Sequence, residues 1–309
     1  MRKIITNYHF NKYEEVRAED AFHDFLKDKE LLNSSSFTID FYERNIGYFL
    51  QFIGDKYVYE ITPEDIDLYI EELLERELKI VSINTRLRAV RTFINYCAEK
   101  ELIKHFKVKM LKDTQEVPDT YTNKELARLL ARPKTNNYVE IRTWAFINFA
   151  VGTGCRISTI MDIKIRDLDF ENQTITLRKV KNRKQQIIPM STTLSKVLTW
   201  YLKGWNCDID DYLFSSSQKT KCSNRTMQQE VYKYNLKRGV TRTSVHAFRH
   251  SFARNYIQAG GDVVKLQQLL GHSNLNITMK YVKLYGDDLK EGYEELNPLN
   301  NIMGNKWRW

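Results

Sequence analysis

The sequence has little cysteine and no long apolar run, and both features exclude classes of protein. Four cysteines are spread over 309 residues without a CxxC pair, which argues against a disulfide framework or a cysteine-rich zinc site. No stretch approaches the roughly 18 uninterrupted apolar residues of a membrane span, and the N-terminus MRKIITNYHFNKYEE lacks the apolar core of a secretory signal. Repeats and low-complexity segments are absent from the sequence as well. We therefore expect a cytoplasmic protein with reduced thiols and no membrane partner.

The chain is long enough for two domains, and its charge is unevenly divided between them. A length of 309 residues with 42% hydrophobic residues suggests two domains, although one domain is not excluded. Residues 1–115 carry 18 basic and 21 acidic side chains, a net charge of −3, whereas residues 116–309 carry 30 and 18, a net charge of +12. The second half therefore suits a polyanion as partner.

Three amphipathic helices are predicted in the N-terminal half. Residues 36–54 have helical apolar spacing and end in a glycine, and a second helix opens at Thr62, where Asp65 completes a variant of the capping box. A third helix starts at Ser82 and carries Arg86, Arg88 and Arg91 off its apolar face. Charge is sorted along this half, because residues 60–77 hold eight acids and residues 78–112 hold nine basic residues. The basic helix either contacts DNA or is simply a solvated surface, and this pattern alone favours neither.

The C-terminal half is predicted to be helical around one β-hairpin. Residues 112–121 read as a linker, a capping box TNKE opens the next helix at Thr122, and residues 137–154 form a buried helix broken at Gly152 and Gly154. Two β-prone runs, 174–178 and 186–190, flank a lysine-rich turn. The remaining predicted helices cover residues 192–203, 224–237, 244–259, 262–270 and 274–285.

Residues 244–260 hold histidines and an arginine that could meet one target. His246 lies three residues before Arg249 and four before His250, so either pair shares a helix face. A zinc protease motif would need Glu after the first histidine, where Ala247 stands. A phosphate anion suits His246 and Arg249 better, although HxxR by itself is common and often structural.

Two further stretches offer cations. Arg156 follows a glycine turn at the start of a helix, whose free N–H groups favour anions. Lys181 lies in the hairpin turn among other cations, any one of which taken alone is as well explained as a solvated loop residue; they are Arg178, Lys179, Arg183 and Lys184.

In this order the motifs resemble the tyrosine recombinase (phage integrase) family. The matching stretches are GTGCRIS (152–158), VKNRKQQIIPM (180–190), HAFRHSFA (246–253) and LLGHSNLNITMKYV (269–282). The resemblance implies a mainly α fold with a small β-hairpin or sheet, with an N-terminal helical core-binding (SAM-like) domain at 1–111, a linker at 112–121 and an α+β catalytic domain at 122–309. It also implies a site-specific recombinase that cleaves and rejoins DNA through a 3′-phosphotyrosyl link, in integration, excision, transposition or resolution. A silent DNA-binding protein and a type IB topoisomerase are the alternatives.

The resemblance assigns roles to single residues and implies a partner. Tyr281 is expected to attack the scissile phosphate, Arg156 and Arg249 to hold it, and His246 and His272 to assist. Lys181 is expected to protonate the leaving 5′ oxygen. Double-stranded DNA bound by a homotetramer at two sites is the expected partner, and neither a metal nor another cofactor is expected. Additional DNA contacts are expected from Arg86, Arg88, Arg91, Lys179, Arg183 and Lys184.

The sequence departs from the family pattern at several positions. Thr159 replaces the usual acidic residue, and Asp162, three residues later on the same helical face, is the candidate to substitute for it. The glycines that usually flank the hairpin lysine are absent, which weakens the choice of Lys181 over its neighbours. About 20 residues precede the first expected core-domain helices, which favours a short Xer, Cre or transposon type without an arm-binding domain. The tail after Tyr285 offers an apolar anchor, either for a neighbouring subunit or for the chain itself; its residues are Leu289, Tyr293, Leu296 and Leu299.

Tyr281 and Tyr285 compete for the role of nucleophile. They lie four residues apart, so helical direction cannot choose between them. The nine-residue interval from His272 and the context TMKYV match the family's nucleophile at Tyr281.

Overall fold

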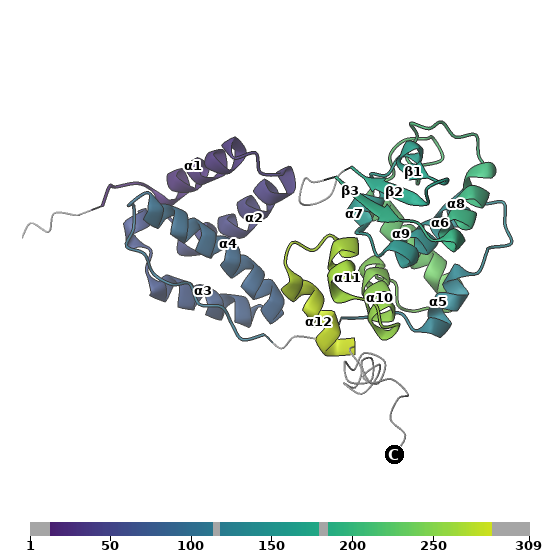
Figure 1. Ribbon diagram of the computed structural model, residues 1–309. Helices are drawn as coiled ribbons and strands as arrows, with labels where there is room; N and C mark the ends of the chain where they lie inside the picture. Colours follow the sequence, from purple (N-terminus) through teal and green to yellow (C-terminus); the bar gives the residue numbers. More distant parts are fainter. Residues whose placement is uncertain (1–12, 114–117, 179–184, 286–309) are drawn as a thin grey trace, which may run out of the picture. The chain divides into compact units, whose positions relative to one another are not determined.

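The chain divides into two compact units, residues 1–115 and 116–309, and each has its own apolar core. The structure is a computed structural model that describes residues 13–113, 118–178 and 185–285 (Figure 1). Helices dominate both units and one small antiparallel sheet lies in the second, which confirms the predicted fold class. Within the described ranges, no helix is both long enough and apolar enough to cross a bilayer.

Within residues 13–113, the N-terminal unit is a bundle of four helices. They are α1 (Ala18–Leu31), α2 (Ser36–Ile53), α3 (Pro63–Glu75) and α4 (Ile80–Glu99), with a short 3₁₀ turn η1 (Val58–Glu60). The predicted capping box opens α3, because Thr62 accepts from the Asp65 N–H and Asp65 accepts from the Thr62 N–H. Helix α4 begins two residues before the predicted Ser82 and buries Leu87, Val90 and Phe93 against its neighbours. Arg88 and Arg91 are thereby left exposed on the outer side of α4.

The second unit is built around helix α6. Its helices are α5 (Asn123–Leu130), α6 (Tyr138–Thr153), α7 (Ile157–Ile160), α8 (Thr192–Lys203), α9 (Asn224–Lys237), α10 (Val245–Gln258), α11 (Val263–Leu270) and α12 (Leu275–Tyr285). Helix α6 is apolar around most of its circumference, as expected for a core helix, and it packs against α5, α8, α9 and α10. The predicted break at Gly152 is wrong, since α6 runs through that residue and ends at Gly154.

A three-stranded sheet lies beside this core. Its strands are β1 (Leu168–Asp169), β2 (Thr174–Leu177) and β3 (Gln186–Pro189), in the order β1-β2-β3, and η2 (Ile165–Asp167) precedes them. The two predicted strands are β2 and β3, paired antiparallel with Ile175 opposite Ile188. Strand β1 was not predicted because two residues carry too little periodicity. The side chains of Ile175, Leu177 and Ile188 are buried in the main core and anchor the sheet there. Gln186, the first residue of β3, is thereby held beside the start of α7 and the end of α11.

Candidate active site

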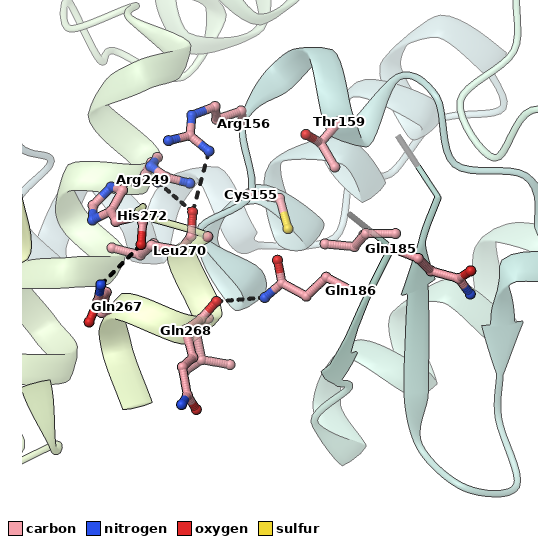
Figure 2. A pocket seen from close by; sticks show the side chains of 13 residues that line it. Cys155, Arg156, Thr159, Gln185, Gln186, Arg249, Gln267, Gln268, Leu270 and His272 are labelled. Atoms are coloured by element: carbon pink, nitrogen blue, oxygen red, sulfur yellow. Dashed lines mark hydrogen bonds between the residues drawn. The ribbon is translucent and has the colours of Figure 1, made fainter. Parts of the chain in front are cut away.

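Arg156 and Arg249 converge on one backbone oxygen, the carbonyl of Leu270 (Figure 2). Arg156 is the N-cap residue of α7 and reaches this oxygen at 3.4 Å, while Arg249, on α10, reaches it at 2.7 Å. Arg249 also donates to the Gly154 carbonyl at 2.9 Å. Helices α7 and α10 and the end of α11 therefore bring together two guanidinium groups that are 93 residues apart in sequence.

Gly154 makes this approach sterically feasible. Its φ of +63° is the left-handed conformation that ends α6, a region that residues with a Cβ seldom adopt. A Cβ at this position would lie 2.5 Å from Phe252 Cδ1 and 2.9 Å from Leu270 Cδ2. The glycine in GTGCR is therefore needed both to turn the chain into α7 and to let α10 and α11 close on that turn.

The two arginines have no acidic partner within the parts of the chain that the structure describes. Arg249 is 6% exposed, and burial, followed by the nearby positive charge of Arg156, lowers its pKa to about 10. Thr159 is buried and lines the same cavity, so no carboxylate stands where the family has one. The idea that Asp162 replaces it is wrong, because Asp162 pairs with Lys221 instead. The site is a cavity with net positive charge, which favours an anionic ligand.

His272 has both ring nitrogens in hydrogen bonds, which fixes its tautomer. Arg249 lies 2.7 Å from His272 Nε2, and because a guanidinium can only donate, Nε2 accepts. The proton is therefore on Nδ1, which donates to Thr278 Oγ1 at 2.9 Å. Burial, and then the charges of Arg249 and Arg156, lower the pKa of His272 to about 4. His272 is thus a neutral acceptor that orients Arg249.

The lowered pKa of His272 predicts a loss of stability in mild acid. The unfolded chain binds the proton near pH 6.5 and the folded protein only near pH 4, so between these values the unfolded state binds more protons and stability falls as pH falls. We expect this residue to remove about 2 kcal/mol from the free energy of unfolding between pH 7 and pH 5. Urea unfolding at both pH values measures the loss, and His272→Gln, which cannot titrate, should show a smaller drop over the same interval. An equal drop in both proteins would contradict the assignment of a neutral His272.

A cavity of about 440 Å³ opens at these residues. The residues that line it include Arg156, Arg249, His272, Thr159 and Gln186. Figure 2 shows the two arginines on one side of the cavity, and Gln186 of β3 with the preceding Gln185 on the other. Gln186 Nε2 donates to the Gln268 carbonyl at 2.5 Å, which ties β3 to the end of α11. The cavity has the size and donor groups for a phosphate with its adjoining sugar.

Tyr281 lies next to His272 but bonds a different histidine. Its hydroxyl is 2.7 Å from His250 Nδ1, and its ring lies parallel to that of His272 with centroids 6.4 Å apart. Tyr281 is 6% exposed and packs with Ala253, Leu266 and Leu270. It is not among the described residues that line the cavity. Its effect on the pKa of Arg249 is to raise it, against the larger lowering by burial and Arg156.

The structure thus brings together four of the predicted catalytic residues and adds one. Arg156, Arg249, His272 and Tyr281 gather around the C-terminus of α11, while His246 is exposed one helical turn before His250. His250 was noted only as a residue sharing a face with His246, and its bond to Tyr281 was missed. The HxxxH spacing was the available signal, but only the packing of α12 on α10 decides which of the two histidines meets the tyrosine.

The remaining predicted residues lie elsewhere. Lys181, Lys179, Arg183 and Lys184 fall outside the described residues, as does the apolar anchor at Leu289, Tyr293, Leu296 and Leu299. On α4, Arg88 and Arg91 are exposed one turn apart, whereas Arg86 is half-buried over the Tyr48 ring at 4.6 Å. Among the described residues no cluster of histidine, cysteine and carboxylate side chains is arranged to hold a metal ion.

Taken as chemistry, the arrangement suits attack by a hydroxyl on an anionic ester. Two guanidiniums offer donors to phosphate oxygens, His272 keeps one of them in place, and a phenol stands beside the pair with an imidazole on its oxygen. Fixed positive charge stabilises the transition state where negative charge grows on the phosphate.

Comparison with known proteins agrees over both units. Residues 120–287 match the model of the phage integrase family, and residues 22–104 match that of the phage integrase N-terminal SAM-like domain. The chain is 28% identical to the tyrosine recombinase XerA of Pyrococcus furiosus, over 94% of this chain and 99% of that protein, and 26% identical to XerC of Oceanobacillus iheyensis, over 93% and 97%.

Solved structures share the fold. The Tn1549 transposon integrase in complex with transposon right end DNA has a TM-score of 0.76 at 20% identity, covering 89% of this chain and 96% of that one. A lambda integrase tetramer bound to a Holliday junction has a TM-score of 0.71 at 16% identity, covering 90% and 80%.

Proposed function

This chain belongs to the phage integrase family, and we propose that it recombines DNA with Tyr281 as the nucleophile. It is a tyrosine recombinase, an enzyme of site-specific DNA strand exchange, and DNA is its partner. One observation supports the assignment of the site. Two arginines without a carboxylate partner among the described residues converge with His272 at the end of α11, and Tyr281 lies on the next helix.

In the proposed cleavage step, Arg156 and Arg249 bind the non-bridging oxygens of the scissile phosphate in place of their present backbone partner. The Tyr281 oxygen attacks the phosphorus, and the 5′ oxygen leaves with a proton from a general acid, the role proposed for Lys181. The product is a 3′-phosphotyrosyl link. A 5′ hydroxyl from a partner strand reverses the reaction, so the bond energy is conserved and neither ATP nor a metal is required. His246, exposed on the same helix as Arg249, is proposed to hydrogen bond the phosphate.

We propose further that four copies act on two DNA sites. Strand exchange needs two cleaved duplexes and therefore four cleavage sites, one for each nucleophile. The lambda integrase tetramer on a Holliday junction, which shares this fold, supports that arrangement. The recombinases among the similar proteins argue against a type IB topoisomerase or a silent DNA-binding protein.

A suicide DNA substrate tests the reaction. A nick close to the cleavage point makes the strand that carries the free 5′ hydroxyl so short that it diffuses away after cleavage. Rejoining is then impossible, and the enzyme stays covalently attached to the DNA. We expect an adduct that survives denaturing electrophoresis and disappears after protease treatment. A cognate site that is bound tightly but gives no adduct would overturn the enzymatic proposal in favour of a silent binder.

For the N-terminal unit we propose that α4 faces DNA through Arg88 and Arg91. Both are exposed and one turn apart, so they present a paired positive charge. Reversing both to Glu should weaken DNA binding at least about 10-fold at moderate salt and reduce the slope of log affinity against log salt by about two. The control is the same charge reversal, Lys27→Glu, at an exposed position on α1. An unchanged slope in the α4 variant, measured by fluorescence anisotropy, would place the DNA on another face. Arg86, held over Tyr48, is proposed as a further contact from the same helix.

A further inference from the structure

The bond between Tyr281 and His250 raises the question of where the tyrosine proton goes. A phenol has an unperturbed pKa of about 10 and is protonated at neutral pH, so it attacks a phosphate only if a neighbouring group accepts its proton. Three histidines lie near enough in the fold to be considered, on α10 and in the turn between α11 and α12: His246, His250 and His272.

His272 is not free to act as that acceptor. Its Nε2 already accepts from Arg249 and its Nδ1 already carries a proton that it donates to Thr278. Taking a proton at Nε2 would place a cation against the Arg249 guanidinium and break the bond that orients it. His272 therefore orients an arginine of the proposed phosphate site, and its ring lies parallel to that of Tyr281 with both ring nitrogens already in hydrogen bonds.

His250 has the geometry that His272 lacks. Its Nδ1 is 2.7 Å from the Tyr281 oxygen, within the range of a strong hydrogen bond. The two rings lie with centroids 5.7 Å apart and planes inclined at 44°, and His250 is half-buried between α10 and α12. His246, by contrast, is exposed on the preceding turn.

We propose that His250 is a catalytic residue that accepts the Tyr281 proton at Nδ1 during cleavage and returns it during rejoining. This inference rests on Tyr281 being the nucleophile. In cleavage the bond from the Tyr281 oxygen to phosphorus forms, the bond from phosphorus to the 5′ oxygen breaks, and the phenolic proton moves to Nδ1. In rejoining the 5′ hydroxyl attacks phosphorus and returns its proton to the group that protonated it in cleavage, proposed to be Lys181. The bond from phosphorus to the tyrosine oxygen breaks, and the imidazolium gives its proton back to the departing phenolate.

The surroundings keep His250 neutral and therefore able to accept. Burial, then the charges of His246 and Arg249, lower its pKa, and the smaller effect of Asp119 opposes them. The titratable and charged groups that face it are His246 and Arg249 on α10, Tyr281 on α12, His272 before α12, and Asp119 before α5. When neutral His250 carries its proton on Nε2, the lone pair of Nδ1 accepts the hydrogen bond from the Tyr281 hydroxyl. As the pH is lowered from neutrality, cleavage should therefore fall once the pH drops below this lowered pKa.

Two substitutions separate proton transfer from positioning. In His250→Asn the side-chain amide replaces Nδ1 as a hydrogen-bonding partner but cannot take a proton, and in His250→Ala both functions are lost. We expect single-turnover formation of the adduct on the suicide substrate to slow by about 10²- to 10³-fold in both variants. Added imidazole should restore part of the rate in His250→Ala only. An Asn variant that cleaves within a few-fold of the unmodified enzyme would overturn the proposal.

A substrate with sulfur in place of the bridging 5′ oxygen separates this role from that of the general acid. A thiolate leaves without being protonated, so such a substrate removes the need for an acid and retains the need for a base. The defect of His250→Asn should persist on it, and full recovery would overturn the proposal.

Tyr281→Phe distinguishes the two levels of inference. An adduct formed by Tyr281→Phe would refute the proposed nucleophile and the role of His250 with it. If Tyr281→Phe is inactive while His250→Asn is fully active, the proposed function stands and only the base is refuted. Thermal unfolding and DNA binding of each variant confirm that a slow rate reflects chemistry.

Discussion

Replacing Tyr281 with phenylalanine is expected to abolish the covalent adduct on a suicide substrate while leaving DNA affinity intact. The substitution removes one oxygen, which we propose to be the attacking atom, and keeps the ring that packs with Ala253, Leu266 and Leu270. Losing a nucleophile lowers the rate by on the order of 10⁴-fold or more. The stability cost should be about 1 kcal/mol, the usual value of the single hydrogen bond that His250 loses.

Tyr285→Phe is the matched control, since it makes the same chemical change one helical turn later, at the last residue of α12. We expect this variant to form the adduct at a normal rate. Denaturing electrophoresis of labelled DNA measures both reactions, and gel shift under native conditions measures binding. An adduct from Tyr281→Phe that vanishes in Tyr285→Phe would move the nucleophile to Tyr285.

Removing either arginine of the pair should slow cleavage by at least about 10²- to 10³-fold, the usual cost of losing a preorganised group that stabilises a transition state. We choose Arg156→Ala and Arg249→Met for this test. Arg156 is half-buried with one long bond of 3.4 Å, so its loss should leave stability nearly unchanged. Arg249 is buried and its pKa is lowered to about 10, so burial and the nearby charge of Arg156 destabilise its charged form by roughly 3 kcal/mol.

An anion in the cavity should recover part of that cost. We therefore expect sulfate or orthovanadate to raise the melting temperature of the unmodified protein, and to raise that of Arg249→Met much less. Sodium chloride at matched ionic strength separates site binding from general screening. Equal shifts in both proteins would show that the anions bind elsewhere and would contradict the proposed phosphate clamp.

Local signals in the sequence predict most of the secondary structure. Each of these signals acts within a few residues. Capping boxes begin helices at Thr62 and Thr122, and the left-handed conformation of Gly154 ends a helix, as expected. Gly152 was misread because its open surroundings, with only Leu194 near, let a helix continue through it. Glycine lowers helix propensity without ending a helix, and the buried residues on the rest of α6 keep Gly152 in the helix.

The candidate site is a different matter, because its contacts join distant parts of the chain. Motif spacing selects Arg156, Arg249, His272 and Tyr281, but it does not reveal that the Leu270 carbonyl receives both guanidiniums. Nor does it distinguish His246 from His250, since the choice depends on how α12 packs on α10. Asp162 shows the same limit: one helical turn from Thr159 in sequence, it is bound to Lys221.

The small cluster around Tyr281 has a consequence for timing. Ala253, Leu266, Leu270 and Tyr281 form a cluster separate from the main core around α6. Few buried side chains mean a low free energy of local opening, so α12 can loosen while α6 and its neighbours stay folded. If Tyr281 is the nucleophile, as we propose, its exposure is expected to depend on a local equilibrium within this unit, which DNA binding could shift without loss of the global fold.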